Sequence, residues 1–104
     1  NDNIIVERVS RFPEVRRDLS LVIDNGVQYK DILAMAHKTE RKLIKDVNVF
    51  DLYEGQNIGD DKKAYSVKFI LEDKEKTLTD KVIDKTMSRL MRAYEEELGA
   101  IIRQ

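Results

Sequence analysis

The order of its periodic segments constrains this chain most strongly. Apolar and polar residues alternate through residues 16–24 (RRDLSLVID), a pattern typical of a half-buried strand. The same pattern predicts strands at 46–55 and 64–73, and a short one in the terminal segment 99–103. Two segments with apolar residues at helical spacing, 29–44 and about 79–98, lie between these strands. The predicted order is therefore strand, helix, strand, strand, helix, strand.

Local capping residues support the second helix. Thr77 and Asp80 have the spacing of a capping box, and Thr79 directly precedes Asp80, so either threonine can accept a hydrogen bond from the first turn. Gly99 follows the last apolar residue, at the position where a left-handed glycine often ends a helix. These residues predict a helix that ends at residue 98.

This order is typical of the ferredoxin-like βαββαβ sandwich, an α+β fold. Two right-handed crossovers place both helices on one face of a four-stranded antiparallel sheet and leave the other face uncovered. A chain of 104 residues supports one modest core, so we expect residues 1–104 to form a single domain. Because the chain opens with Asn1 and not with Met, we expect it to be the C-terminal piece of a longer protein.

Composition excludes several classes of function. Nineteen basic and twenty acidic residues give a net charge of −1, which argues against binding nucleic acid through a general basic field. The chain has no cysteine, and no apolar run approaches the ~20 residues that span a bilayer. His37 is the single histidine and has no second histidine or cysteine as a partner, so we expect a solvated side chain. No catalytic or metal motif is present, and we expect no catalysis and no cofactor in this domain.

Strand alternation predicts which side chains occupy the uncovered face. We assign the more apolar row of each strand to the core; these rows contain Leu19, Leu21, Ile23, Phe50, Leu52, Tyr65, Val67, Phe69, Leu71, Ala100 and Ile102. The outward rows then contain Asp18, Ser20, Val22, Asp51, Tyr53, Ala64, Ser66, Lys68, Ile101 and Arg103. Val47 and Val49 share the face of Asp51 in this assignment, which implies a bulge or a hydrophobic patch.

The predicted outward rows suit unpaired RNA bases. Aromatic rings stack on bases, and carboxylates, hydroxyls and guanidinium groups hydrogen-bond to base edges. A single outward tyrosine is more often only a good strand former, and Asp51 with Arg103 could form a surface ion pair of small effect. Two other functions remain open. One is a regulatory domain that binds a small molecule, for which Asp24-Asn25-Gly26 is a weak version of the expected turn, and the other is a protein-interaction domain.

Five short motifs are more specific than these patterns. They read Phe12-Pro13 with Arg17-Asp18-Leu19, then Phe50-Asp51-Leu52-Tyr53-Glu54-Gly55, Lys62-Lys63-Ala64, Thr77-Leu78-Thr79-Asp80 and Ile102-Arg103. Their order and spacing over residues ~10 to 103 resemble the ferredoxin-fold anticodon-binding domain that ends the beta subunit of bacterial phenylalanyl-tRNA synthetase.

The resemblance implies a function and a set of site residues. It implies a lobe of an (αβ)₂ cytoplasmic enzyme in which the domain contacts the anticodon stem-loop of tRNA-Phe, without a membrane role. The parent enzyme would use ATP and magnesium at another site. Family positions that meet anticodon bases fall on Ser20, Asp51, Tyr53, Ala64 and Arg103. Ala64 replaces the usual serine of the family, so Ser66 or the backbone is expected to supply that contact.

Basic residues flank the predicted site. Arg16 and Arg17, with Arg8 and Arg11 before them, precede or begin the first strand, and Lys62 and Lys63 are expected in the loop between the two middle strands. Each is a candidate for contact with RNA phosphates, and the alternative for each is a solvated charge. Arg17 could also pair with Asp18 or a loop carboxylate.

Overall fold

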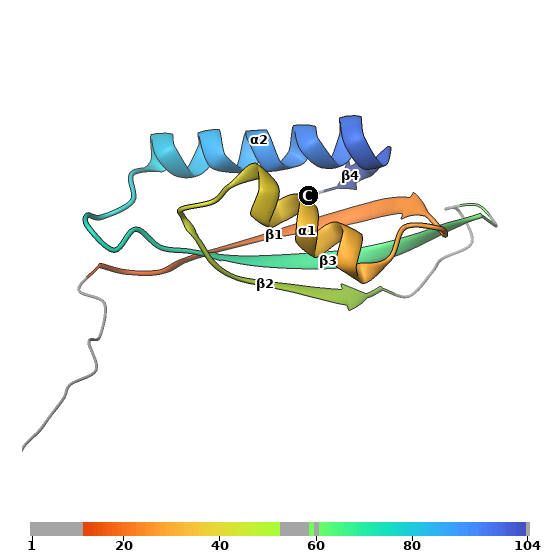
Figure 1. Ribbon diagram of the computed structural model, residues 1–104, viewed down its shortest axis with the longest axis horizontal. Helices are drawn as coiled ribbons and strands as arrows, with labels where there is room; N and C mark the ends of the chain where they lie inside the picture. Colours follow the sequence, from red (N-terminus) through yellow and green to blue (C-terminus); the bar gives the residue numbers. More distant parts are fainter. Residues whose placement is uncertain (1–11, 53–58, 60, 104) are drawn as a thin grey trace, which may run out of the picture.

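A computed structural model of the chain describes residues 12–52, 59 and 61–103. Its elements are β1 (Val15–Asp24), α1 (Tyr29–Thr39), β2 (Ile44–Asp51), β3 (Lys62–Leu71), α2 (Asp80–Leu98) and β4 (Ile101–Arg103). The strands form one antiparallel sheet in the order β2-β3-β1-β4, and both helices lie on the same side of it (Figure 1). The predicted ferredoxin-like fold is confirmed.

Several element boundaries differ from the prediction. The first helix ends at Thr39 and not at residue 44, and β2 starts at Ile44 and ends at Asp51. The side chain of Glu40 explains the early end of α1, because its Oε2 accepts hydrogen bonds from the backbone N–H groups of Lys42 (3.1 Å) and Leu43 (2.9 Å). These bonds turn the chain out of the helix and into β2. The third strand begins at Lys62, two residues early.

Glu40 also connects the two helices. Its carboxylate lies in the interior and accepts a 2.6 Å hydrogen bond from the guanidinium of Arg89 on α2, which also donates to the carbonyl of Thr39 at 2.8 Å. Burial alone would raise the pKa of Glu40, but the bonds from Leu43, Lys42 and Arg89 outweigh it and hold that pKa below its ordinary value. The start of β2 is thus fixed by a buried, ionised carboxylate.

The core fills the space between the helices and the inner rows of the sheet. Fully buried side chains include Leu21, Ile23, Val67, Phe69, Leu71, Ile32, Leu90 and Tyr94. The hydroxyl of Tyr94 donates a 3.0 Å hydrogen bond to the carbonyl of Ile32, so its one polar group is satisfied inside the core. The inward rows predicted for the first and third strands are confirmed.

The second helix has the predicted ends. The hydroxyl of Thr79 accepts a hydrogen bond from the N–H of Val82 at 3.2 Å, and Gly99 adopts the left-handed conformation with φ 68°. The chain then reverses, and Ile101, Ile102 and Arg103 pair with Val22, Leu21 and Ser20 of β1. Over the described residues, neither helix is long and apolar enough to cross a membrane.

Candidate nucleic-acid interface

The uncovered face of the sheet brings together one residue from each strand. Phe50 pairs with Ser66, Ser66 with Ser20, and Ser20 with Arg103. Directly paired residues of antiparallel strands share a face, so these four side chains form one row across the whole sheet. Phe50 and Arg103 at its ends are exposed, whereas the two serines between them are half-buried. The row combines an aromatic ring, two hydroxyls and a guanidinium.

An apolar row runs beside this polar one. Val22 pairs with Ala64 and with Ile101, and the N–H of Leu52 donates to the carbonyl of Ala64 at 2.9 Å. Val22 and Ala64 are buried, whereas Leu52 and Ile101 are exposed. The two central strands thus provide a floor of small side chains, and the two edge strands provide larger ones. We call the surface formed by these two rows the open face.

The prediction for β2 is wrong. Val47 and Val49 pair with Phe69 and Val67 of the core row, so they point toward the helices, and Asp51 on the same face pairs with Tyr65. Phe50 and Leu52, predicted to be inward, are exposed. The apolar patch that Val47 and Val49 would have made on the outside is instead the inner row of the strand. Tyr53 lies outside the described residues.

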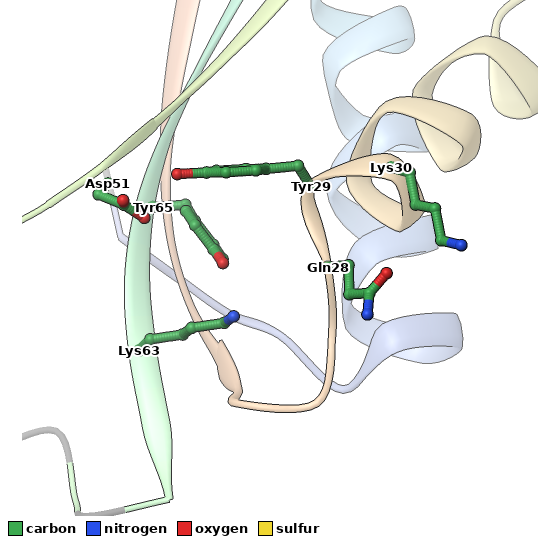
Figure 2. A pocket seen from close by; sticks show the side chains of 6 residues that line it. All are labelled: Gln28, Tyr29, Lys30, Asp51, Lys63 and Tyr65. Carbon is green, nitrogen blue, oxygen red and sulfur yellow. The ribbon is translucent and has the colours of Figure 1, made fainter.

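Asp51 lies in a shallow pocket on the helix-covered side of the sheet. The pocket has a volume of about 520 Å³ and is lined by Gln28, Tyr29, Lys30, Asp51, Lys63 and Tyr65 (Figure 2). The rings of Tyr29 and Tyr65 are tilted by 56° with centroids 5.3 Å apart, and the Nζ of Lys63 lies 5.2 Å from the centroid of the Tyr65 ring. This arrangement joins the end of β2 to the first turn of α1.

The carboxylate of Asp51 has a partner within this pocket. The Tyr29 hydroxyl points toward it in Figure 2, and the hydrogen bond between the two raises the pKa of Tyr29 above its ordinary value. Sequence reasoning did not identify Tyr29. Its position at the start of a helix gave no indication of a contact with a residue 22 positions later.

The predicted basic residues divide between the two faces. Arg16 and Lys62 pair with Ile70 and Asp24 on the uncovered face, whereas Arg17 and Lys63 pair with residues of the inner rows. Asp18 is bound by Arg16 through two 3.2 Å hydrogen bonds and not by Arg17, whose guanidinium donates to the carbonyl of Arg16 at 2.8 Å. Lys62 and Lys63 belong to β3 and not to the loop. Arg8 and Arg11 lie outside the described residues.

The described part of the chain contains no group of three or more histidine, cysteine or acidic side chains that could bind a metal ion. His37 is exposed on α1. The side chains of the open face offer stacking, through Phe50, and hydrogen bonding, through Ser20, Ser66 and Arg103.

Comparison with known proteins identifies the family. The family described as "Ferredoxin-fold anticodon binding domain" matches residues 10–103. Phenylalanine–tRNA ligase beta subunits from Bacteroides fragilis and Bacteroides thetaiotaomicron are 48% identical over 97 and 100 residues, or 93% and 96% of this chain. The beta subunit from Listeria monocytogenes is 31% identical over 98% of the chain. The chain spans only 12–13% of the length of these relatives. With a match over nearly its whole length, the chain belongs to the ferredoxin-fold anticodon-binding domain family.

Proposed function

We propose that the chain is the anticodon-binding module of a phenylalanine–tRNA ligase beta subunit. In this role it holds tRNA-Phe in position for an aminoacylation that takes place elsewhere in the enzyme. One structural observation carries the proposal: Ser66, Ser20 and Arg103 lie in a row on the sheet face that neither α1 nor α2 covers. The family match and the relatives support it.

The chemistry of the open face suits unpaired bases. The guanidinium of Arg103 can donate two parallel hydrogen bonds to a base edge or a phosphate. Ser20 and Ser66 offer hydroxyls that both donate and accept, and the small side chains of Val22 and Ala64 let a base approach the sheet. Ala64 itself contributes only its backbone and its small size.

Asp51 and Tyr53 enter the proposal differently. The carboxylate of Asp51 lies on the helix-covered side, so it would meet the same RNA only if the anticodon loop passes over the free edge of β2. We keep Asp51 as a candidate contact from that side. Tyr53 remains a prediction from the family motif.

The relatives also support a proposal for the rest of the assembly. We propose an alpha subunit as partner in an (αβ)₂ enzyme, with ATP and magnesium bound outside this domain and a cytoplasmic location. A net charge of −1 gives the domain little general attraction to RNA, so most of the affinity is expected to come from other sites on the same tRNA.

Kinetics of the complete ligase test the proposal. Arg103→Ala should lower kcat/KM for tRNA-Phe roughly 10- to 100-fold, the range of a lost bidentate contact, and leave ATP–pyrophosphate exchange unchanged. Arg92→Ala, an exposed arginine on α2, is the matched control and should change neither rate. Wild-type enzyme should also discriminate against a tRNA with a swapped anticodon. Unchanged charging by Arg103→Ala, or an equal loss of amino-acid activation, would contradict the proposal.

A further inference from the structure

Phe50 is exposed although it is a paired residue of β2, one position before the strand ends. Its side chain is 49% exposed, whereas Phe69 on the neighbouring strand is fully buried. Phe50 pairs with Ser66. Because the serine side chain is small, it leaves space on the sheet surface beside the ring. A large apolar ring in this position contributes little to the core, because the row that packs against the helices is that of Val47 and Val49.

A cation lies beside the ring. The Nζ of Lys68 is 6.0 Å from the centroid of Phe50, at the limit of a cation–π contact. Lys68 is two residues from Ser66 on β3 and faces the same side of the sheet. The acid paired across from it, Asp18, is bound by Arg16 through two 3.2 Å hydrogen bonds and forms no ion pair with Lys68. Lys68 therefore remains available to an anionic ligand near the ring.

The position of Phe50 within its row relates it to the proposed RNA site. It occupies the β2 end and Arg103 the β4 end, three strand spacings apart, or about 14 Å. A base stacked on the ring of Phe50 is centred at the β2 edge, so Arg103 at the opposite edge is placed to contact a different nucleotide. A flat ring with an adjacent ammonium group suits a stacked base and a nearby backbone phosphate.

We propose that Phe50 is a stacking platform for one unpaired nucleotide of the bound RNA, and that Lys68 contacts a phosphate beside it. This inference rests on the proposed function. Stacking is tolerant of base identity, because every base has a π-face. Phe50 thus supplies affinity at the β2 edge, and Arg103 supplies discrimination between bases at the β4 edge.

Binding of tRNA-Phe by the complete ligase tests this division. Phe50→Ala should raise the Kd roughly 5- to 150-fold, the range for a lost base stack. Phe50→Tyr keeps the ring and should bind like wild type, whereas Phe50→Leu keeps apolar area without a ring and should bind like Phe50→Ala. Val82→Ala, which trims an exposed apolar side chain on α2, is the matched control and should leave the Kd unchanged. Unfolding midpoints of all variants should stay close to wild type.

Modified RNA and salt identify the two contacts. Each nucleotide of the anticodon loop is made abasic in turn, and the Kd is measured with wild-type enzyme and with Phe50→Ala. The two enzymes should bind equally well at one abasic position only, the position whose base stacks on the ring. Lys68→Met should reduce the slope of log Kd against log salt by about one phosphate contact.

The outcomes separate this inference from the function on which it rests. If Arg103→Ala weakens binding but Phe50→Ala does not, the stacking platform is wrong and the anticodon-binding proposal stands. If neither variant matters and a swapped anticodon binds equally well, the proposed function itself fails. A Phe50→Leu variant that binds like wild type, or a Phe50→Ala variant that only loosens subunit association, would make Phe50 a protein contact and overturn the inference.

Discussion

Side chains alternate between the two faces in the central strands β1 and β3 and in the edge strand β2. The sequence predicted the inward face correctly only for the central strands. In β1 one row is clearly apolar, and Leu19, Leu21 and Ile23 are buried as expected. In β2 both rows are apolar, since Val47 and Val49 alternate with Phe50 and Leu52. The strand therefore offers two registers of nearly equal hydrophobicity.

Packing against the helices decides between the two registers of β2. The core between the helices and the sheet takes up Val47, and Val49 packs against its edge. Placing Phe50 and Leu52 inward would require a one-residue slip against β3 and would turn Asp51 away from Tyr29. Only one apolar row of β2 is needed to fill the core. The second apolar row, on the exposed face of this edge strand, is therefore a candidate binding surface.

The largest expected effect tests this choice on β2. Val47→Asp puts a carboxylate without a partner into the core and should cost roughly 3–5 kcal/mol of unfolding free energy. Phe50→Asp adds the same charge three residues later on the exposed face and should stay within about 1 kcal/mol. Urea denaturation of the 104-residue chain measures both. The reverse order of the two values would show that β2 has the other face inward.

The next effect concerns the loop that leads into β2. Glu40→Gln weakens the bonds to Lys42, Leu43 and Arg89 and should cost roughly 1–3 kcal/mol at neutral pH. Because the pKa of Glu40 is lowered in the folded state, this contribution is complete above the unfolded value of about 4.3 and is lost as the pH falls through the folded pKa.

An exposed glutamate provides the control for that measurement. Glu75 forms a 3.9 Å ion pair with Lys42 at the surface, so Glu75→Gln should change the stability by less than about 0.5 kcal/mol. Unfolding curves between pH 3 and 7, a range of about four units around the usual glutamate pKa, give the comparison. A Glu40→Gln difference that persists undiminished at the acid end would contradict the assigned role.

A smaller effect is expected at the opposite edge of the sheet. Gly99 has φ 68° where α2 turns into β4, and a Cβ there would meet nothing within 4 Å. Gly99→Ala should therefore cost only the backbone strain, about 1–2 kcal/mol. Gly99→Asn, whose side chain tolerates the left-handed conformation better than that of alanine, serves as control in a thermal unfolding series and should lose less. Equal losses in Gly99→Ala and Gly99→Asn would exclude a special role for the left-handed turn.

The smallest effect is spectroscopic. Asp51→Asn removes the carboxylate that holds the Tyr29 proton, so the pKa of Tyr29 should fall toward its ordinary value of about 10. Any stability from this contact is present below that value and is lost as the pH rises through the folded pKa. Ultraviolet titration of phenolate absorbance follows the change, and the titration of Tyr94, whose pKa is raised by burial, should not move. A Tyr29 titration identical to wild type would place Asp51 outside this pocket.

The sequence by itself determined the order of elements, the ends of α2 and the inner rows of β1 and β3, because these depend on local capping and on one clearly apolar face. It also carried the motifs of the family, which include Arg103, and its alternation placed Ser20 and Ser66 in the outward rows. Only the tertiary structure decided the orientation of β2 and the pairing of Asp51 with Tyr29. Those depend on which of two apolar rows the helices cover, and that choice is made by packing between segments far apart in the chain.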